Sequence, residues 1–458
     1  MTPSNPVSLF RTPWRVCLML CVTLLSAVPS AAHASLLADR LEISMYGRMG
    51  LAWTPTSGRF IQGQSLNLTG SSIGGRFEEG DYLEPTIRLH VLEKQEAADA
   101  PYVDMVLTPS MYSANGLFAG VFSTRFSTAL SIQLFQAYME AGNVLLPGLR
   151  VWGGARFYRG TDVHIADYYF FNNLSGQGGG VAYGPLDVAV ILQTSATGNQ
   201  YNFDVNGDGT MDIRRQRTAF VAQYVHKLEP GHSIHGLAEL HVLPSARARL
   251  EDGTQVGLRS DYGWVLGVKG HLELGNGNFN DLSVRYGTRI ANGSRGGAQT
   301  WDTFGAPDLR GLYTDAAGLE VVDHFVFNFG PLFSLNGYGT LHWNQGASGS
   351  EMDRSLDYAV GARGIFYLHD NFHLVGEASH QGLQPGSADM AMATRLTIAP
   401  TFVPAGGRSV WSRPHYRIFY TTAFYNEAAV NGRYAPYLQT VGPSSVAHYL
   451  GARVEWWF

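Results

Sequence analysis

The last eleven residues, His448 to Phe458, are HYLGARVEWWF. Every second residue, counted back from the terminus, is apolar: Phe458, Trp456, Val454, Ala452 and Leu450. The residues between them are charged, aromatic or glycine: Trp457, Glu455, Arg453, Gly451 and Tyr449. Because side chains alternate across a β-strand, each set lies on its own face. One face suits lipid and the other suits the wall of a water-filled lumen. The pattern predicts the closing strand of a membrane-spanning β-barrel.

The start of the chain is typical of an export signal. Two arginines precede an apolar run at residues 16–27, which is too short to span a bilayer. Residues 32–34 (Ala-His-Ala) form a small-x-small cleavage site. We expect residues 1–34 to be removed and residues 35–458 to form a single barrel domain. Both cysteines lie in the removed segment, so disulfides and thiol chemistry are excluded from the mature chain.

The composition also favours strands. The chain has 54 glycines, 23 tyrosines and 24 phenylalanines, and only 15% of its residues are charged. A soluble helical domain would carry more charge and less glycine. After the signal segment no run of 18 or more apolar residues occurs, so we expect no transmembrane helix. The net charge is −5 and no basic block is present, which argues against a nucleic-acid partner.

Alternating apolar and polar residues predict strands along the whole mature chain. The clearest are 41–53, 82–92, 149–158, 215–226, 233–243, 281–290, 357–368, 372–381 and 413–424. With weaker stretches the total is about 17, and because bacterial barrels have even strand numbers, 16 or 18 strands are expected.

The predicted connections alternate in length. The short ones are Asn143–Gly148, Lys227–Gly231, Gly330–Pro331 and His369–Asn371. The long ones are 54–80, 160–180, 194–214, 244–260, 291–320, 382–391 and 426–445. Short turns at one rim and long loops at the other are typical of outer-membrane barrels. No plug precedes the first strand, so we expect a water-filled lumen.

Four stretches resemble the maltoporin family of trimeric, sugar-selective porins. The most specific is Val151 to Phe170, VWGGARFYRGTDVHIADYYF, and the second is Val410 to Tyr420, which contains Trp-Ser-Arg-Pro. The other two are Tyr46-x-Arg48 and the Glu-Trp-Trp-Phe terminus. The resemblance implies an all-β, antiparallel transmembrane barrel with 18 strands, with 16 as the alternative. It also implies a homotrimer in outer-membrane lipid, narrowed by an inward-folded loop at about residues 162–180.

The function implied by the resemblance is facilitated diffusion of oligosaccharides, with maltose and maltodextrins as the default. An aromatic lane carries the apolar faces of sugar rings, and a polar track bonds to their hydroxyls. The lane positions are matched by Tyr46, Tyr82 and Trp457. The track positions are matched by Arg48, Glu84, Asp162, Asp167 and Tyr169. Strand alternation independently assigns Tyr46, Arg48, Tyr82, Glu84 and Trp457 to the lumen face.

Alternatives to this assignment remain open. The family's charged pattern is thinner here, because Gly160, beside Arg159, and the pair Phe135–Gln136 stand near two of its arginines. A general diffusion porin with little sugar selectivity is therefore the second hypothesis. The lane aromatics could be lipid-facing, and the track charges could simply compensate one another. Asp162 and Asp167 could pin the inward loop to the wall. No enzyme motif is present, so we expect a channel and no catalytic residue.

One segment suggests a structural calcium ion. Oxygen ligands occupy positions 1, 3, 5 and 9 of a calcium loop, namely Asp204, Asn206, Asp208 and Asp212. Gly209 stands at position 6, but Arg215 replaces the usual glutamate at position 12. The segment is either a calcium site that orders an external loop or a polar loop rich in turn-forming residues. Transport itself needs no cofactor.

Overall fold

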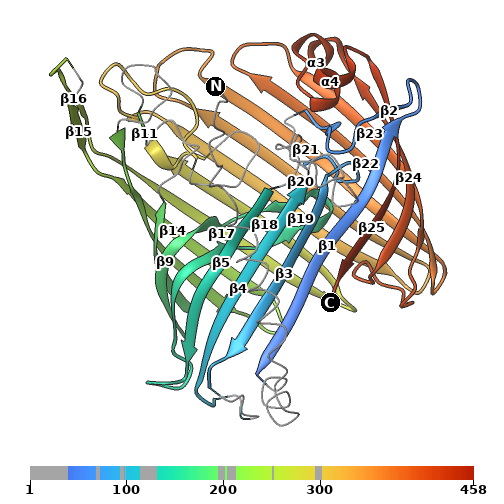
Figure 1. Cartoon of the computed structure of the whole chain (residues 1–458), viewed down its shortest axis with the longest axis horizontal. Coiled ribbons are helices and arrows are strands. Elements are labelled where there is room, and N and C mark those ends of the chain that lie inside the picture. Colours follow the sequence, from blue (N-terminus) through green and yellow to red (C-terminus); the bar gives the residue numbers. More distant parts are fainter. Residues whose placement is uncertain are drawn as a thin grey trace, which may run out of the picture.

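The computed structural model describes residues 40–68, 73–92, 97, 99–113, 131–193, 202–203, 213–249, 252–293 and 302–458. Over this part of the chain, eighteen strands form one antiparallel barrel (Figure 1). In barrel order they are β1 (Leu41–Thr54), β3 (Asp81–His90), β4 (Tyr102–Ser113), β5 (Ser131–Gly142), β6 (Arg150–Arg159), β9 (Asn173–Tyr183), β10 (Leu186–Gln193), β13 (Arg217–Lys227), β14 (Ser233–Leu243), β17 (Asp261–Gly275), β18 (Asn278–Thr288), β19 (Ala317–Phe329), β20 (Phe333–Gln345), β21 (Arg354–His369), β22 (Phe372–Pro385), β23 (Ala391–Phe402), β24 (His415–Tyr425) and β25 (Val446–Trp457).

The barrel closes where its first and last strands meet. β1 pairs with β3 on one side and with β25 on the other, where Tyr46 lies opposite Trp457 and Leu51 opposite Ala452. Closure satisfies the backbone hydrogen bonds of both edges, as a bilayer requires. The prediction of 18 strands and of a closing C-terminal strand is confirmed, and the alternative of 16 strands is wrong.

The two faces of each strand differ as the alternation predicts. On β1, Ile43 and Leu51 are 52% and 50% exposed on the outside, whereas Arg48 is only 6% exposed on the inside. On β25, Arg453 and Glu455 point inward and are buried. The lumen face therefore carries the charges, and the outer face carries apolar side chains for lipid.

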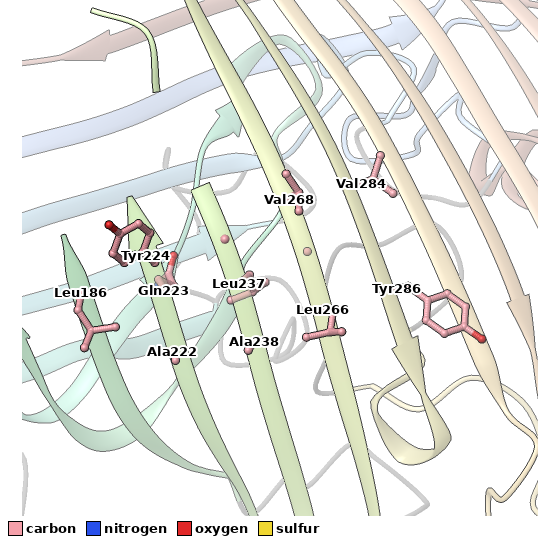
Figure 2. A pocket seen from close by; sticks show the side chains of 12 residues that line it. Leu186, Ala222, Gln223, Tyr224, Leu237, Ala238, Leu266, Val268, Val284 and Tyr286 are labelled. Atoms are coloured by element: carbon pink, nitrogen blue, oxygen red, sulfur yellow. The ribbon is translucent and has the colours of Figure 1, made fainter. Parts of the chain in front are cut away.

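Part of the outer face is visible in Figure 2. Leu186, Tyr224, Leu266, Val268 and Tyr286 project from neighbouring strands around the small residues of β13 and β14. All five are more than a third exposed. Their surroundings form a shallow, almost wholly apolar hollow, which is suited to contact with acyl chains.

The connections differ in length between the two rims. The short ones are residues 143–149, 184–185, 228–232, 276–277, 330–332 and 370–371, which overlap all four predicted turns. The connection predicted as long at 382–391 is only residues 386–390, because β22 and β23 extend further than expected. The long connections at the other rim contain η2 (Arg289–Ala291), α3 (Glu427–Gly432), α4 (Pro436–Val441) and the strand pairs β11 (Asn202–Phe203) with β12 (Ile213–Arg214) and β15 (Ala246–Arg249) with β16 (Gln255–Leu258) (Figure 1). No helix in the described residues is long and apolar enough to cross a bilayer.

Loop 3, residues 160–172, folds into the lumen. It contains β7 (Asp162–Val163), η1 (His164–Ala166) and β8 (Tyr168–Tyr169), and β7 pairs with β8 as a small hairpin. An inward loop was predicted, but its predicted end near residue 180 is wrong, because β9 already begins at Asn173. The glycine-rich residues 175–180 are wall, not loop. A Cβ on Gly180 would collide with the indole of Trp152, so glycine is required for this packing.

Loop 1, residues 55–80, also enters the lumen, which the sequence analysis did not anticipate. Its short strand β2 (Arg59–Phe60) pairs with the end of β1. Ile61, Leu66 and Phe77 are almost completely buried in a cluster with residues of β22 to β25. The connection at residues 403–414, which precedes β24, was not predicted, and the strand predicted to begin at Arg413 begins at His415.

Candidate functional site

Three aromatic rings lie in a row on the lumen face of adjacent strands. Tyr82 comes from β3, Tyr46 from β1 and Trp457 from β25. The ring centroids of Tyr46 and Tyr82 are 5.9 Å apart, and those of Tyr46 and Trp457 are 6.5 Å apart and stacked. The barrel seam thus brings together residues from both ends of the chain, because Tyr46 and Trp457 are direct partners in the ladder.

Arg48 lies beside this row and is held from several sides. Its Nε donates to the carbonyl of Gly80 at 3.1 Å, and its Nη1 donates to the Tyr46 hydroxyl at 3.3 Å. Its Nη1 also lies 3.2 Å from Glu79 of loop 1. Glu84, which follows Tyr82 by two residues on β3, accepts a short hydrogen bond from the Tyr82 hydroxyl. Arg48 and Glu84 therefore border the aromatic row.

The tip of loop 3 lies opposite these strands. Asp167, which has a left-handed backbone (φ 46°), is 3.9 Å from Arg48 and 3.6 Å from Arg76 of loop 1. Its side chain remains 38% exposed to the lumen. Partial desolvation at this narrow point raises the pKa of the Asp167 carboxyl, and Arg76 opposes the rise. Asp162 contacts His164 at 3.7 Å. Loops 1 and 3 thus meet the wall at one charged constriction.

Tyr169 is covered by Arg159, the arginine that precedes Gly160. The guanidinium of Arg159 lies 3.8 Å from the Tyr169 ring centroid and 3.9 Å from that of Phe157. Gln136 accepts a hydrogen bond from the Phe157 amide at 3.0 Å, and Phe135 packs on the Phe157 ring. Arg159 therefore places a charge next to Gly160, and Phe135 and Gln136 both contact Phe157.

Arg413 is a site residue that the sequence analysis quoted within a motif but did not assign. Its guanidinium lies 3.8 Å from the Trp457 ring centroid, and its Nε is 3.2 Å from Glu455. Burial lowers the pKa of Arg413 to about 9, against the opposing attraction of Glu455. His164 approaches Trp457 edge-on, with ring centroids 5.1 Å apart. One side of the last ring in the row is thus bordered by cationic and polar groups.

A buried network fixes loop 3 to the far wall. The Tyr168 hydroxyl donates to Glu320 at 2.6 Å and lies 2.5 Å from Nε2 of His342. Arg285 pairs with the same glutamate at 3.1 Å. Lys269 donates to the hydroxyl of Thr161 at 2.6 Å. Because these groups are buried and mutually satisfied, they anchor the loop in one position.

Loop 1 is anchored across the lumen by an equally buried pair. Arg395 of β23 contacts Glu78 at 2.8 Å, and both side chains are 2% exposed. The Tyr338 hydroxyl accepts from the amide of Gly74 at 2.8 Å. The sequence did not predict a role for Arg76, Glu78 and Glu79. They lie in a loop, where no strand alternation indicates which side chains face the lumen.

The calcium-type residues Asp204, Asn206, Asp208 and Asp212 lie outside the described residues. Within the described ranges, no group of three or more histidine, cysteine, aspartate or glutamate side chains is placed to hold a metal ion. Calcium in the external loop stays a prediction.

One protein family and several solved structures match this chain. The family model described as LamB porin matches residues 41–458. Among solved structures, OccAB1 of Acinetobacter baumannii is 10% identical, with 92% of this chain and 96% of that chain covered and a TM-score of 0.45. OpdK of Pseudomonas aeruginosa with vanillate is 8% identical, with 92% and 99% covered and a TM-score of 0.44. OmpF of Salmonella typhi in complex with daunomycin is 8% identical, with 92% and 98% covered and a TM-score of 0.41.

The family match spans the whole barrel, from the first residue of β1 to the C-terminus. It confirms the resemblance drawn from the motifs, and it confirms that the protein transports rather than catalyses. The chain belongs to the LamB porin family, and it is an outer-membrane β-barrel channel.

Proposed function

We propose that this channel carries linear oligosaccharides of the maltose and maltodextrin type by facilitated diffusion. The observation that carries the proposal is the row Tyr82, Tyr46 and Trp457 on the lumen face. A pyranose ring offers an apolar C–H face that packs on an aromatic ring, and three successive rings give it successive resting places. The spacing of about 6 Å lets one sugar reach the next ring before leaving the last.

The polar groups beside the row would exchange hydrogen bonds with the hydroxyls of the sugar. We assign this role to Arg48, Glu84, Asp162, Asp167 and Tyr169. The partial exposure of Asp167 at the constriction supports its role in binding sugar hydroxyls. Charge-assisted hydrogen bonds are individually strong, and several adjacent sites of moderate affinity allow a ligand to leave as well as enter.

The second candidate is a general diffusion porin. Its support is that the constriction charges already pair with one another, as Arg48 does with Glu79 at 3.2 Å. Arg413 also lies over the ring of Trp457 at 3.8 Å, where a sugar would compete with it. In this case ions and small solutes would pass without saturation.

We also propose that the channel assembles as a homotrimer, as the resemblance implies, and that residues 1–34 are removed on export. Chemical cross-linking in outer membranes should give a ladder that ends at three subunits. N-terminal sequencing of the same material should begin at Ser35. For the external segment at residues 204–212, calcium titration of the folded channel should show one binding event that Asp208→Asn weakens.

The test of transport is planar-bilayer conductance of the purified trimer, titrated with maltotriose and other oligosaccharides. We expect saturable closure by a sugar. Tyr46→Ala or Trp457→Ala should raise the half-blocking concentration about tenfold, the equivalent of about 1.4 kcal/mol of lost ring contact. Tyr416→Ala, which removes a half-exposed outer-face ring, is the matched control. Current that is indifferent to every sugar would leave the general porin as the function.

A further inference from the structure

A small, largely enclosed cavity lies between the tip of loop 3 and the wall formed by β20 to β24. We call it the arginine cavity, because Arg363, Arg413 and Arg417 line it together with His415 and His164. The cavity has a volume of about 10 Å³. That is the threshold size for holding one bound water molecule.

The charges around this cavity do not balance. Arg363 pairs with Glu377 at 2.6 Å, whereas Arg413 at 3.2 Å and Arg417 at 2.8 Å share the single carboxylate of Glu455. Three guanidiniums thus face two carboxylates, which leaves one positive charge in excess. His164 also contacts Glu455, at 3.3 Å, and brings no negative charge to the cavity. Buried charge without compensation is costly, so a counter-charge is expected in reach.

Two buried groups at the cavity lack hydrogen-bond partners within the described residues: Nε of Arg417 and Nε2 of His415. These residues are 6% and 1% exposed. The other ring nitrogen of His415, Nδ1, lies 2.5 Å from Nη2 of Arg417. Because a guanidinium only donates, Nδ1 must accept, and in the neutral ring Nε2 then carries the proton. Both unpaired groups are therefore donors that need an acceptor.

We propose that the arginine cavity binds one monatomic anion, which is chloride in ordinary media. The residues that line the cavity carry two unpaired donors and an excess positive charge, and the cavity is small enough to limit the occupant to one small species. A water molecule would accept from both donors but would leave the charge uncompensated. The anion would hold Arg417 and, through the shared Glu455, Arg413 over Trp457. The cavity shares Arg413 and His164 with the surroundings of Trp457, but the proposal does not depend on which solute the channel carries.

The test is anomalous diffraction from crystals of the full channel grown in sodium bromide. We expect one bromide peak within hydrogen-bond distance of Arg417 Nε and His415 Nε2. The peak should be lost in Arg417→Gln and retained in the control Arg88→Gln, which removes a half-buried lumen arginine paired with Asp104 on another part of the wall. Absence of the peak in the unmodified channel, or its presence in Arg417→Gln, would overturn the proposal.

A solution measurement covers the case in which the variant does not crystallise. The midpoint of thermal unfolding is compared in potassium chloride and potassium gluconate at equal ionic strength. Because ligand binding to the folded state raises its stability, chloride should raise the midpoint of the unmodified channel and of Arg88→Gln. Arg417→Gln should lose this chloride-specific shift. An equal midpoint in both salts for the unmodified channel contradicts a bound chloride and leaves water as the occupant.

Discussion

Tyr46 and Trp457 stack at the barrel seam, with ring centroids 6.5 Å apart and ring planes 30° from parallel. The Tyr46 hydroxyl also donates to Glu455 at 3.2 Å and accepts from Arg76 at 2.9 Å. One side chain therefore supplies a ring to the aromatic row and a polar link between the wall and loop 1. These two contributions can be separated by substitution.

Tyr46→Phe keeps the ring and removes the hydroxyl, whereas Tyr46→Ala removes both. If the ring is the platform for sugar, Tyr46→Phe should change the half-blocking sugar concentration by less than about threefold, and Tyr46→Ala should raise it about tenfold. The measurement is sugar block of single-channel current. Equal losses in both variants would assign the effect to the hydroxyl network rather than to stacking.

Tyr168→Phe should loosen loop 3 without touching the aromatic row. The change removes the donor to Glu320, and a buried carboxylate that loses one donor destabilises its surroundings by about 1–3 kcal/mol. We expect a lower thermal midpoint and more frequent current fluctuations in the absence of sugar. Tyr183→Phe, which alters an exposed tyrosine of β9, is the matched control and should behave like the unmodified channel.

The strands and their faces were predictable because each strand obeys a local rule. A residue of β1 or β25 faces lipid or lumen according to its parity alone, so Arg48 and Trp457 could be assigned to the lumen without a structure. The aromatic row required one further step, the closure of the barrel, which the C-terminal alternation already indicated.

The loops were not predictable to the same degree, because no periodic pattern constrains them. Ile61 and Phe77 are apolar, but no periodic pattern shows that loop 1 folds inward, and the inward position of loop 3 was expected only through the family resemblance. The run at residues 175–180 was assigned to the loop because glycine lacks the side chain that reveals alternation. Its place in β9 follows from the space that Trp152 occupies. Arg413 was placed in a strand, and its contact with Trp457 depends on the path of residues 403–414.

The buried pair Glu78–Arg395 gives a test of the inward position of loop 1. Glu78→Gln or Arg395→Met leaves one buried charge without its partner, which should cost about 3–5 kcal/mol of unfolding free energy. The double variant Glu78→Leu, Arg395→Met should recover much of this loss. Urea unfolding measures both, and an increased conductance in the single variants would show that loop 1 narrows the lumen.

The control for the Glu78–Arg395 variants is the exposed pair Asp370–Arg408, whose charged atoms are 2.7 Å apart. This pair lies at the rim where most connections are short. Because solvent screens it, Arg408→Gln should cost less than about 1 kcal/mol and leave the conductance unchanged. Comparable losses at the two pairs would contradict the view that burial makes Glu78–Arg395 an anchor.

Ion selectivity should depend on pH through Asp167. Burial raises the pKa of this carboxyl, so it takes up a proton at a higher pH than an ordinary aspartate as the solution is acidified. Protonation removes a negative charge that faces Arg48 and Arg76. The constriction then becomes more positive, and its preference for anions over cations should increase as pH falls.

The measurement is the reversal potential in a potassium chloride gradient, followed as the pH is lowered. Asp167→Asn should show the stronger anion preference already at pH 7 and should lack the corresponding step. Asp252→Asn, a change at an exposed aspartate of an external loop, should titrate like the unmodified channel. A step that survives unchanged in Asp167→Asn would contradict its assignment to Asp167.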